Sequence, residues 1–130
     1  MTDENAIELR VPGKREYALV IRTALGGAAI LNNLDVDAMD DLRMAADEAC
    51  DCLLHQGLAV TALAVTICDR GGRIHVAIEA ELEGDGRGRG ADDLAIVQAV
   101  LETLAPEVTL LTTPGGCIRR IELALPRPAV

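Results

Sequence analysis

Five stretches of the chain carry the residue pattern of β-strands. Two of them alternate apolar with polar residues, which predicts strands with one buried face, and another is rich in β-branched and apolar residues. The last two flank the turn Pro114-Gly115-Gly116 and predict a closing hairpin. The stretches are residues 6–11, 58–68, 74–82, 107–113 and 117–125.

A first helix is predicted from Lys14 to Asn32, where apolar residues recur three or four positions apart. The pair Gly26-Gly27 lies in its middle and costs about 1 kcal/mol per glycine relative to alanine. We attribute this pair to close packing against a neighbouring element. The expected core-facing residues are Tyr17, Val20, Ile21, Ala24, Leu25, Ala28 and Leu31.

Two more helices are predicted by the same spacing. The second is expected to be capped by Asp37 and to stop at Gly57. The third is expected to be capped by Asp92 or Asp93 and to end at Pro106. Their expected core-facing residues are Val36, Met39, Leu42, Ala46, Ala49, Cys50, Leu53 and Leu54, then Leu94, Val97, Leu101 and Leu104.

Together these elements follow the order β-α-α-β-β-α-β-β. Strands that are adjacent in sequence pair readily as antiparallel hairpins, so we expect an α+β fold. It is a two-layer α/β sandwich with a mixed, mainly antiparallel sheet and three helices on one face. Neither a linker nor a repeat divides the chain, which predicts a single domain over residues 1–130 with loose ends at 1–5 and 126–130.

The charge balance narrows the classes of partner. The chain has 12 Lys and Arg residues against 21 Asp and Glu, a net charge of −9, and Tyr17 is its single aromatic residue. Such a charge repels a phosphate backbone, and bases find almost no aromatic surface on which to stack, so we expect no direct nucleic-acid binding. Proteins and small ligands remain as partners.

The sequence also predicts a compartment. No stretch reaches the ~18 apolar residues that span a bilayer, so no membrane association is expected. The N-terminal segment MTDENAIELR is acidic and lacks the apolar run of a secretory signal. We therefore expect a cytoplasmic protein whose four cysteines are reduced.

Three segments resemble one known family. The strand and long helix of residues 7–27, the helix DDLRMAADEACDCLLHQG (40–57), and the closing helix and hairpin of 101–125 are similar to the bacterial anti-sigma factor serine kinases. These belong to the histidine-kinase-like ATPases, also called GHKL or Bergerat-fold proteins. The resemblance implies that fold, a homodimer, binding of a sigma factor, and phosphorylation of a STAS-type anti-anti-sigma protein on serine with Mg-ATP.

The family binds nucleotide partly through a motif on the second helix, Glu-x-x-x-Asn, and this chain keeps only half of it. Glu48 lies where the family has its general base, whereas Cys52 lies where the Mg²⁺-binding asparagine would be. A thiol is a poor ligand for Mg²⁺, which prefers hard oxygen donors. His55 shares the predicted helix face of Glu48 and Cys52, but as a zinc site these three side chains would lack a fourth ligand.

The second motif, Asp-x-Gly-x-Gly, and the third, a glycine-rich lid, are also incomplete. Aligned on the strand that starts at Arg73, the adenine-reading Asp falls on Ala80 and the first glycine on Leu82. Aligning the motif on the glycines of residues 84–90 instead never puts an Asp at its first position. By themselves these glycines predict a mobile loop. The nucleotide-pocket positions that the resemblance assigns are Glu48, Cys52, His55, Ala80, Leu82, Gly84, Gly86 and Gly88.

These observations leave three hypotheses. The first is a regulatory protein that binds a sigma factor, a STAS-type protein or both by partner switching. In this hypothesis the ATP site has decayed and the protein needs no cofactor. Burying the adenine amino group without a hydrogen-bond acceptor would weaken ATP binding by about 1–3 kcal/mol. The second is an active serine-protein kinase with Glu48 as catalytic base and Mg-ATP as cofactor. The third is a small-ligand sensor built on the old pocket.

Overall fold

The computed structural model describes residues 5–88 and 93–128, and its elements follow the predicted order. Five strands, three α-helices and one short 3-10 helix account for most of these residues. The strands are β1 (Ile7–Pro12), β2 (Ala59–Arg70), β3 (Arg73–Glu83), β4 (Glu107–Thr112) and β5 (Ile118–Pro126). The helices are η1 (Arg15–Tyr17), α1 (Ala18–Leu31), α2 (Val36–Leu54) and α3 (Leu94–Glu102).

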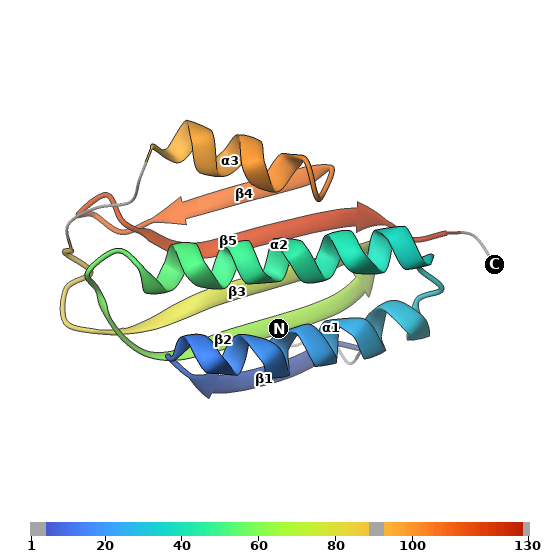
Figure 1. Ribbon diagram of the computed structural model, residues 1–130, viewed down its shortest axis with the longest axis horizontal. Coiled ribbons are helices and arrows are strands. Elements are labelled where there is room, and N and C mark those ends of the chain that lie inside the picture. The colour runs from blue at the N-terminus through green and yellow to red at the C-terminus, as the bar shows by residue number, and fades with distance from the viewer. Residues whose placement is uncertain (1–4, 89–92, 129–130) are drawn as a thin grey trace.

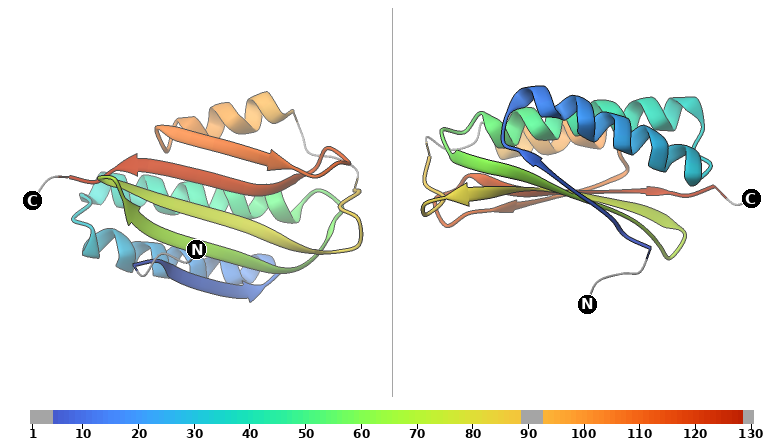
Figure 2. Two further views of the ribbon diagram at one scale, coloured as in Figure 1. Left: turned by 180° about the vertical axis from the view of Figure 1, so that it is seen from behind. Right: turned by 90° about the horizontal axis from the view of Figure 1, so that it is seen from below.

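The strands form one sheet in the order β1-β2-β3-β5-β4, and the helices cover one of its faces (Figures 1 and 2). All four strand pairings of the described residues are antiparallel, so the sheet is antiparallel throughout these pairings rather than mixed. β2 and β3 join through Gly71 and Gly72, whose φ angles of 63° and 74° suit the tight turn of a hairpin. The two-layer arrangement is the predicted one.

The hydrophobic core lies between the sheet and α2, the helix at the centre of the layer (Figure 1). α2 is amphipathic, and its buried face packs over β3 and β5. The alternation predicted for β3 is confirmed, because Ile74, Val76, Ile78 and Ala80 are all buried on that face. The buried residues of α2 are Leu42, Ala45, Ala46, Ala49, Cys50 and Leu53.

Helix α1 buries a narrower face than its sequence predicts. Val20 and Leu31, both expected in the core, are 43% and 75% exposed, because α1 lies at one side of the helical layer and packs mainly against α2. The glycine pair has no packing role among the described residues. A Cβ added at Gly27 would meet no atom of them within 4 Å, and one at Gly26 would meet only the Arg43 side chain, at 4.0 Å. The expectation of close packing at this pair is wrong.

The second helix begins two residues earlier than predicted. Its cap is Asp35 rather than Asp37, and the Asp35 carboxylate accepts a hydrogen bond from the Ala38 N–H at 2.8 Å. Asp37 then falls in the first turn, where a carboxylate favours the helix dipole. Asp93 caps α3 by accepting from the Ala95 N–H, while Asp92 lies outside the described residues.

The C-terminal segment is held beyond Pro126, where a loose end was expected. The Arg127 N–H donates to the Gly72 carbonyl at 2.9 Å, and the Arg127 guanidinium pairs with Asp69. Residues 1–4 and 129–130, also expected to be loose, lie outside the described residues. Over the described part of the chain, no helix combines the length and apolar character needed to cross a membrane.

The face of the sheet away from the helices carries ion pairs between strands. Arg10 of β1 reaches across β2 and donates to Glu81 of β3 at 2.8 Å. The β2 residues in this part of the register, Ala62 and Ala64, are small enough to let it pass. This hydrogen bond holds the pKa of Glu81 below its usual value.

Candidate functional site

The C-terminal half of α2 presents four polar side chains to one pocket. Glu48, Asp51, Cys52 and the C-cap residue His55 recur at helical spacing, and Cys52 also packs against the edge of the core. The pocket has a volume of about 200 Å³ and lies between α2, α3 and the start of β5. Its other lining residues are Gln56, Val97 and Ile118. Three of the predicted positions, Glu48, Cys52 and His55, are thus brought together.

Gln56 forms the inner wall of this pocket and is only 2% exposed. Its side-chain Nε2 donates to the Ile118 carbonyl at 2.8 Å, and its Oε1 accepts from the Ile118 N–H at 2.5 Å. The amide therefore completes the backbone hydrogen bonding of the first residue of β5 and ties it to the end of α2. Sequence reasoning missed Gln56, and its one signal is its place directly before Gly57, where the helix has stopped.

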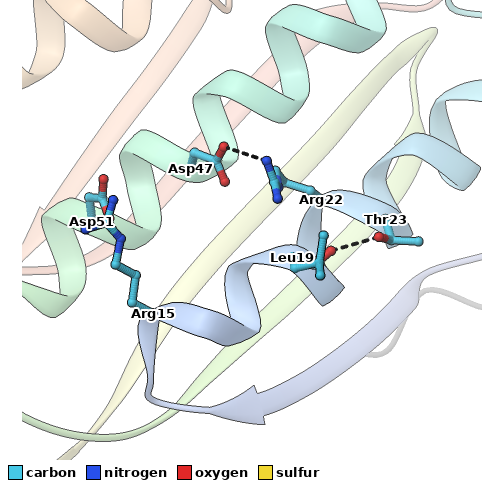
Figure 3. A network of polar contacts seen from close by, with 6 residues as sticks. All are labelled: Arg15, Leu19, Arg22, Thr23, Asp47 and Asp51. Atoms are coloured by element: carbon cyan, nitrogen blue, oxygen red, sulfur yellow. Dashed lines mark hydrogen bonds and ion pairs between the residues drawn. The ribbon is translucent and has the colours of Figure 1, made fainter.

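A carboxylate on the pocket is paired with a cation from the first helical segment. Arg15 of η1 lies 3.3 Å from Asp51, measured between Nε and Oδ1 (Figure 3). One turn earlier on α2, Asp47 lies 3.4 Å from Nη1 of Arg22 of α1. These two ion pairs connect the first helical segments to α2 along the side of the molecule next to the pocket. Asp51 was also missed by sequence reasoning, although it lies four residues before His55.

The other predicted positions lie elsewhere. Ala80 is buried in the core, 1% exposed, so its side chain lines neither this pocket nor the hollow described next. Leu82, Gly84 and Gly86 line a second hollow of about 210 Å³. The remaining residues of this hollow are Asp85, Thr113, Pro114 and Arg119.

The described part of the glycine-rich loop is tied to the rest of the fold at two points. Thr113, at the end of β4, donates from Oγ1 to the Gly86 carbonyl at 2.8 Å and accepts from the Cys117 N–H at 3.2 Å. A Cβ at Gly88 would lie 2.2 Å from the Gln56 carbonyl oxygen, so only glycine fits there without movement. The loop is therefore anchored at Gly86 and Gly88, and residues 89 and 90 lie outside the described residues.

The lining of the first pocket does not suit Mg-ATP. Glu48 and Asp51 are both carboxylates, and the seven lining residues include no Lys, Arg or Asn to hold phosphates or Mg²⁺. Its volume is below the ~300–1,000 Å³ typical of small-molecule sites. Among the described residues, no group of three or more His, Cys, Asp and Glu side chains could hold a metal ion. The pocket offers a possible base, Glu48, without the groups that would position a nucleotide.

The two cysteines of α2 face different surroundings. Cys50 is buried in the core, and burial raises the pKa of its thiol to about 12, assisted by the nearby Asp47 and Asp51 carboxylates. Cys52 is half-buried and lines the pocket. This division follows from their spacing, because residues two apart point to nearly opposite sides of a helix.

The chain is similar in sequence to two curated relatives. It is 34% identical over 80 residues to the anti-sigma-F factor RsbW of Mycobacterium tuberculosis, in strain CDC 1551 / Oshkosh and in strain ATCC 25618 / H37Rv. The matched region covers 62% of this chain and 46% of each relative, so it spans about half the length of the relatives. No family model matches the chain.

The fold is similar to that of a solved structure. The crystal structure of the RsbU and RsbW domains of a Mycobacterium tuberculosis protein superposes with a TM-score of 0.71 at 17% sequence identity. The match covers 95% of this chain and 33% of that one. The predicted α+β fold class is therefore confirmed.

Proposed function

We propose that this chain is an anti-sigma-factor-like regulatory protein, related to the anti-sigma factor serine kinases. It acts by protein–protein contact, switching between a sigma factor and a STAS-type anti-anti-sigma protein. The sequence similarity to anti-sigma-F factor RsbW supports this role. We further propose that the protein works in the cytoplasm as a homodimer, as the family resemblance implies.

The observation that favours binding over catalysis is the pocket beside Glu48. Cys52 replaces the metal-binding amide that the resemblance implies, and Asp51 adds a second carboxylate to the pocket. At the adenine end, Ala80 is buried in the core and offers no acceptor to an amino group. The proposed protein therefore has a decayed ATP site and needs no cofactor.

The second candidate function is that of an active serine-protein kinase. It is favoured by one observation, that Glu48 keeps the position of the family's general base and opens onto a pocket. In that case Mg-ATP would be the cofactor and a STAS-type protein the substrate.

Isothermal titration calorimetry with Mg-ATP separates the two candidates. We expect no heat at millimolar ATP and no rise in melting temperature. A dissociation constant near ~10 μM, about −6.8 kcal/mol, would overturn the decayed-site proposal, and phosphate transfer to a STAS-type protein would then establish the kinase. The matched variant is Cys52→Asn, which restores the metal-binding amide; binding that appears only in this variant would identify Cys52 as the cause of the loss.

Partner binding is tested separately, because it does not depend on nucleotide. Purified protein is immobilised, and a panel of bacterial sigma factors and STAS-type proteins is passed over it. We expect at least one sigma factor to bind and at least one STAS-type protein to compete with it. Binding of neither class would contradict both candidate functions.

A further inference from the structure

An apolar groove lies at the end of the molecule opposite the glycine-rich loop. Four segments meet there: the α1–α2 connection, the first turns of α2, the α3–β4 connection and the end of β5 (Figure 1). The groove has a volume of about 380 Å³, and most of its lining is apolar, with Asp35, Asp41 and Arg127 as its charged residues. We refer to the ten lining residues as the α1–α2 groove: Leu34, Asp35, Ala38, Asp41, Leu104, Pro106, Leu125, Pro126, Arg127 and Pro128.

Large apolar side chains are exposed in the segment of chain that contributes Leu34 and Asp35 to the groove. Ile30, Leu31 and Val36 are 66%, 75% and 68% exposed, the highest values among the large hydrophobic residues that the structure describes. All three lie within seven residues of chain, and Val36 directly follows Asp35 of the groove. Exposed apolar side chains that are concentrated in one short segment, rather than scattered over the surface, are typical of an interaction site.

The charge around the α1–α2 groove is predominantly negative. Asp35 and Asp41 line the groove, Asp37 and Asp40 lie between them in the chain, and residues 23–42 contain no Lys or Arg. Arg127 also lines the groove, but its guanidinium is paired with Asp69. An occupant must therefore bring apolar side chains together with positive charge.

This charge decides between the classes of occupant. A second copy of the chain, which carries a net charge of −9, would place the same four aspartates against their equivalents in a symmetric contact. Nucleic acid would be repelled by the same charge. A cationic protein segment is attracted by it.

We propose that the α1–α2 groove docks a cationic amphipathic helix of a protein partner. Its apolar face would enter the groove and contact Ile30, Leu31 and Val36, while its Lys and Arg residues would lie against the four aspartates. For the identity of the partner this inference rests on the proposed function. Protein segments that contact DNA phosphates are rich in Lys and Arg, and a sigma factor whose segment is held here could not use that segment on DNA.

The direct test uses a designed helical peptide with leucines at i, i+3, i+4 and i+7 and lysines along both flanks. Heteronuclear NMR of the whole chain should show shifts that concentrate at residues 30–41, 104–106 and 125–127. A peptide with glutamate in place of each lysine should give no shifts. Equal shifts with both peptides, or shifts located elsewhere, would overturn the proposal.

Two matched pairs of variants locate the contact. Asp40→Asn/Asp41→Asn removes the charge of the groove residue Asp41 and that of its neighbour Asp40 and leaves the Asp35 cap intact, whereas Glu8→Gln/Glu83→Gln removes two exposed charges elsewhere. We expect about a tenfold loss of peptide affinity at low salt in the first and little change in the second. Val36→Ser should weaken binding, and Ile96→Ser, at an exposed residue of α3, should not.

The same variants separate this proposal from the proposed function. A sigma factor that binds all variants equally would leave the function standing and overturn the docking surface. Peptide binding at the groove without binding of any sigma factor would support the surface and contradict the function. If NMR signals at the groove shift with protein concentration in the absence of peptide, a second copy of the chain occupies the groove. That result would overturn the proposal.

Discussion

Glycines of this chain have opposite roles at different places, and substitution with alanine should reveal them. Gly27 is exposed in the middle of α1 with nothing near its Cβ position among the described residues, so Gly27→Ala should raise the free energy of unfolding by about 0.5–1 kcal/mol. Gly88→Ala should lower it by about 1–3 kcal/mol, because the new Cβ would lie 2.2 Å from the Gln56 carbonyl oxygen. Urea unfolding of both variants measures the two effects.

A loss of stability in Gly27→Ala would contradict this assignment, since it would mean that α1 needs the glycine conformation or close approach there. Sequence reasoning could find where these glycines lie but not what they touch. Gly26 and Gly27 look like a packing site, yet only the tertiary structure shows that α1 lies at the side of the layer with this surface outward.

The buried thiol of Cys50 should make the protein sensitive to alkali. Its pKa is about 12 in the fold against an ordinary value of 9.0, so the thiol stays protonated where the unfolded chain already ionises. The thiol therefore makes its full contribution to the free energy of unfolding below about pH 9, and this contribution is lost as the pH rises toward 12. Between about pH 9 and about pH 10.5 we expect a loss of about 2 kcal/mol.

Comparison with Cys50→Ala isolates this contribution, because other groups also titrate in that range. Cys50→Ala should be less stable than the parent at neutral pH because packing is lost. Urea unfolding at both pH values should nevertheless show a smaller loss of stability at alkaline pH in this variant. An identical loss in both proteins would show that Cys50 is not responsible.

At the scale of elements, the join between α2 and β5 depends on one side chain. Gln56→Leu removes the amide that satisfies both backbone groups of Ile118, so we expect a loss of about 3 kcal/mol in the free energy of unfolding. The amide hydrogen of Ile118 should also exchange faster in this variant. The matched control is Gln98→Leu, whose half-buried amide makes one bond, to the Val108 carbonyl at 2.7 Å, and should cost less. Equal losses in the two variants would contradict the assigned role of Gln56.

The strands and helices themselves could be predicted because each carries its own periodicity. β3 shows this best, since its alternating residues Ile74, Val76 and Ile78 are all buried on one face. The links between elements could not be predicted. Gln56 and Thr113 bond to residues 62 and 27 positions away, and no local pattern distinguishes a polar residue with such a partner from an exposed one.

At the scale of the whole molecule, the candidate site was partly predictable for a related reason. Glu48, Cys52 and His55 lie on one helix, so their spacing alone places them together, and the structure adds α3 and β5 as the opposite walls. Ala80 and the glycines of residues 84–88 come from other elements. Their places, in the core and around a second hollow, depend on how β3 and the β4–β5 turn meet.

The net charge of −9 should make folding stability depend on salt. Like charges on a compact chain repel one another. At an ionic strength of about 0.1 M, salt screens the repulsion between surface charges that lie more than ~10 Å apart. The ion pairs of the described residues lie largely at the surface, where each contributes about 0–1 kcal/mol. Repulsion should therefore outweigh attraction.

Raising NaCl from about 20 mM to about 300 mM should then raise the melting temperature by roughly 2–5 °C. The control is Glu8→Lys/Glu83→Lys, which changes the net charge from −9 to −5 at two exposed positions. This variant should melt higher than the parent at low salt and respond less to added salt. A melting temperature that falls as salt is added would show instead that the interstrand and interhelical ion pairs, such as Arg10–Glu81 and Arg22–Asp47, outweigh the repulsion.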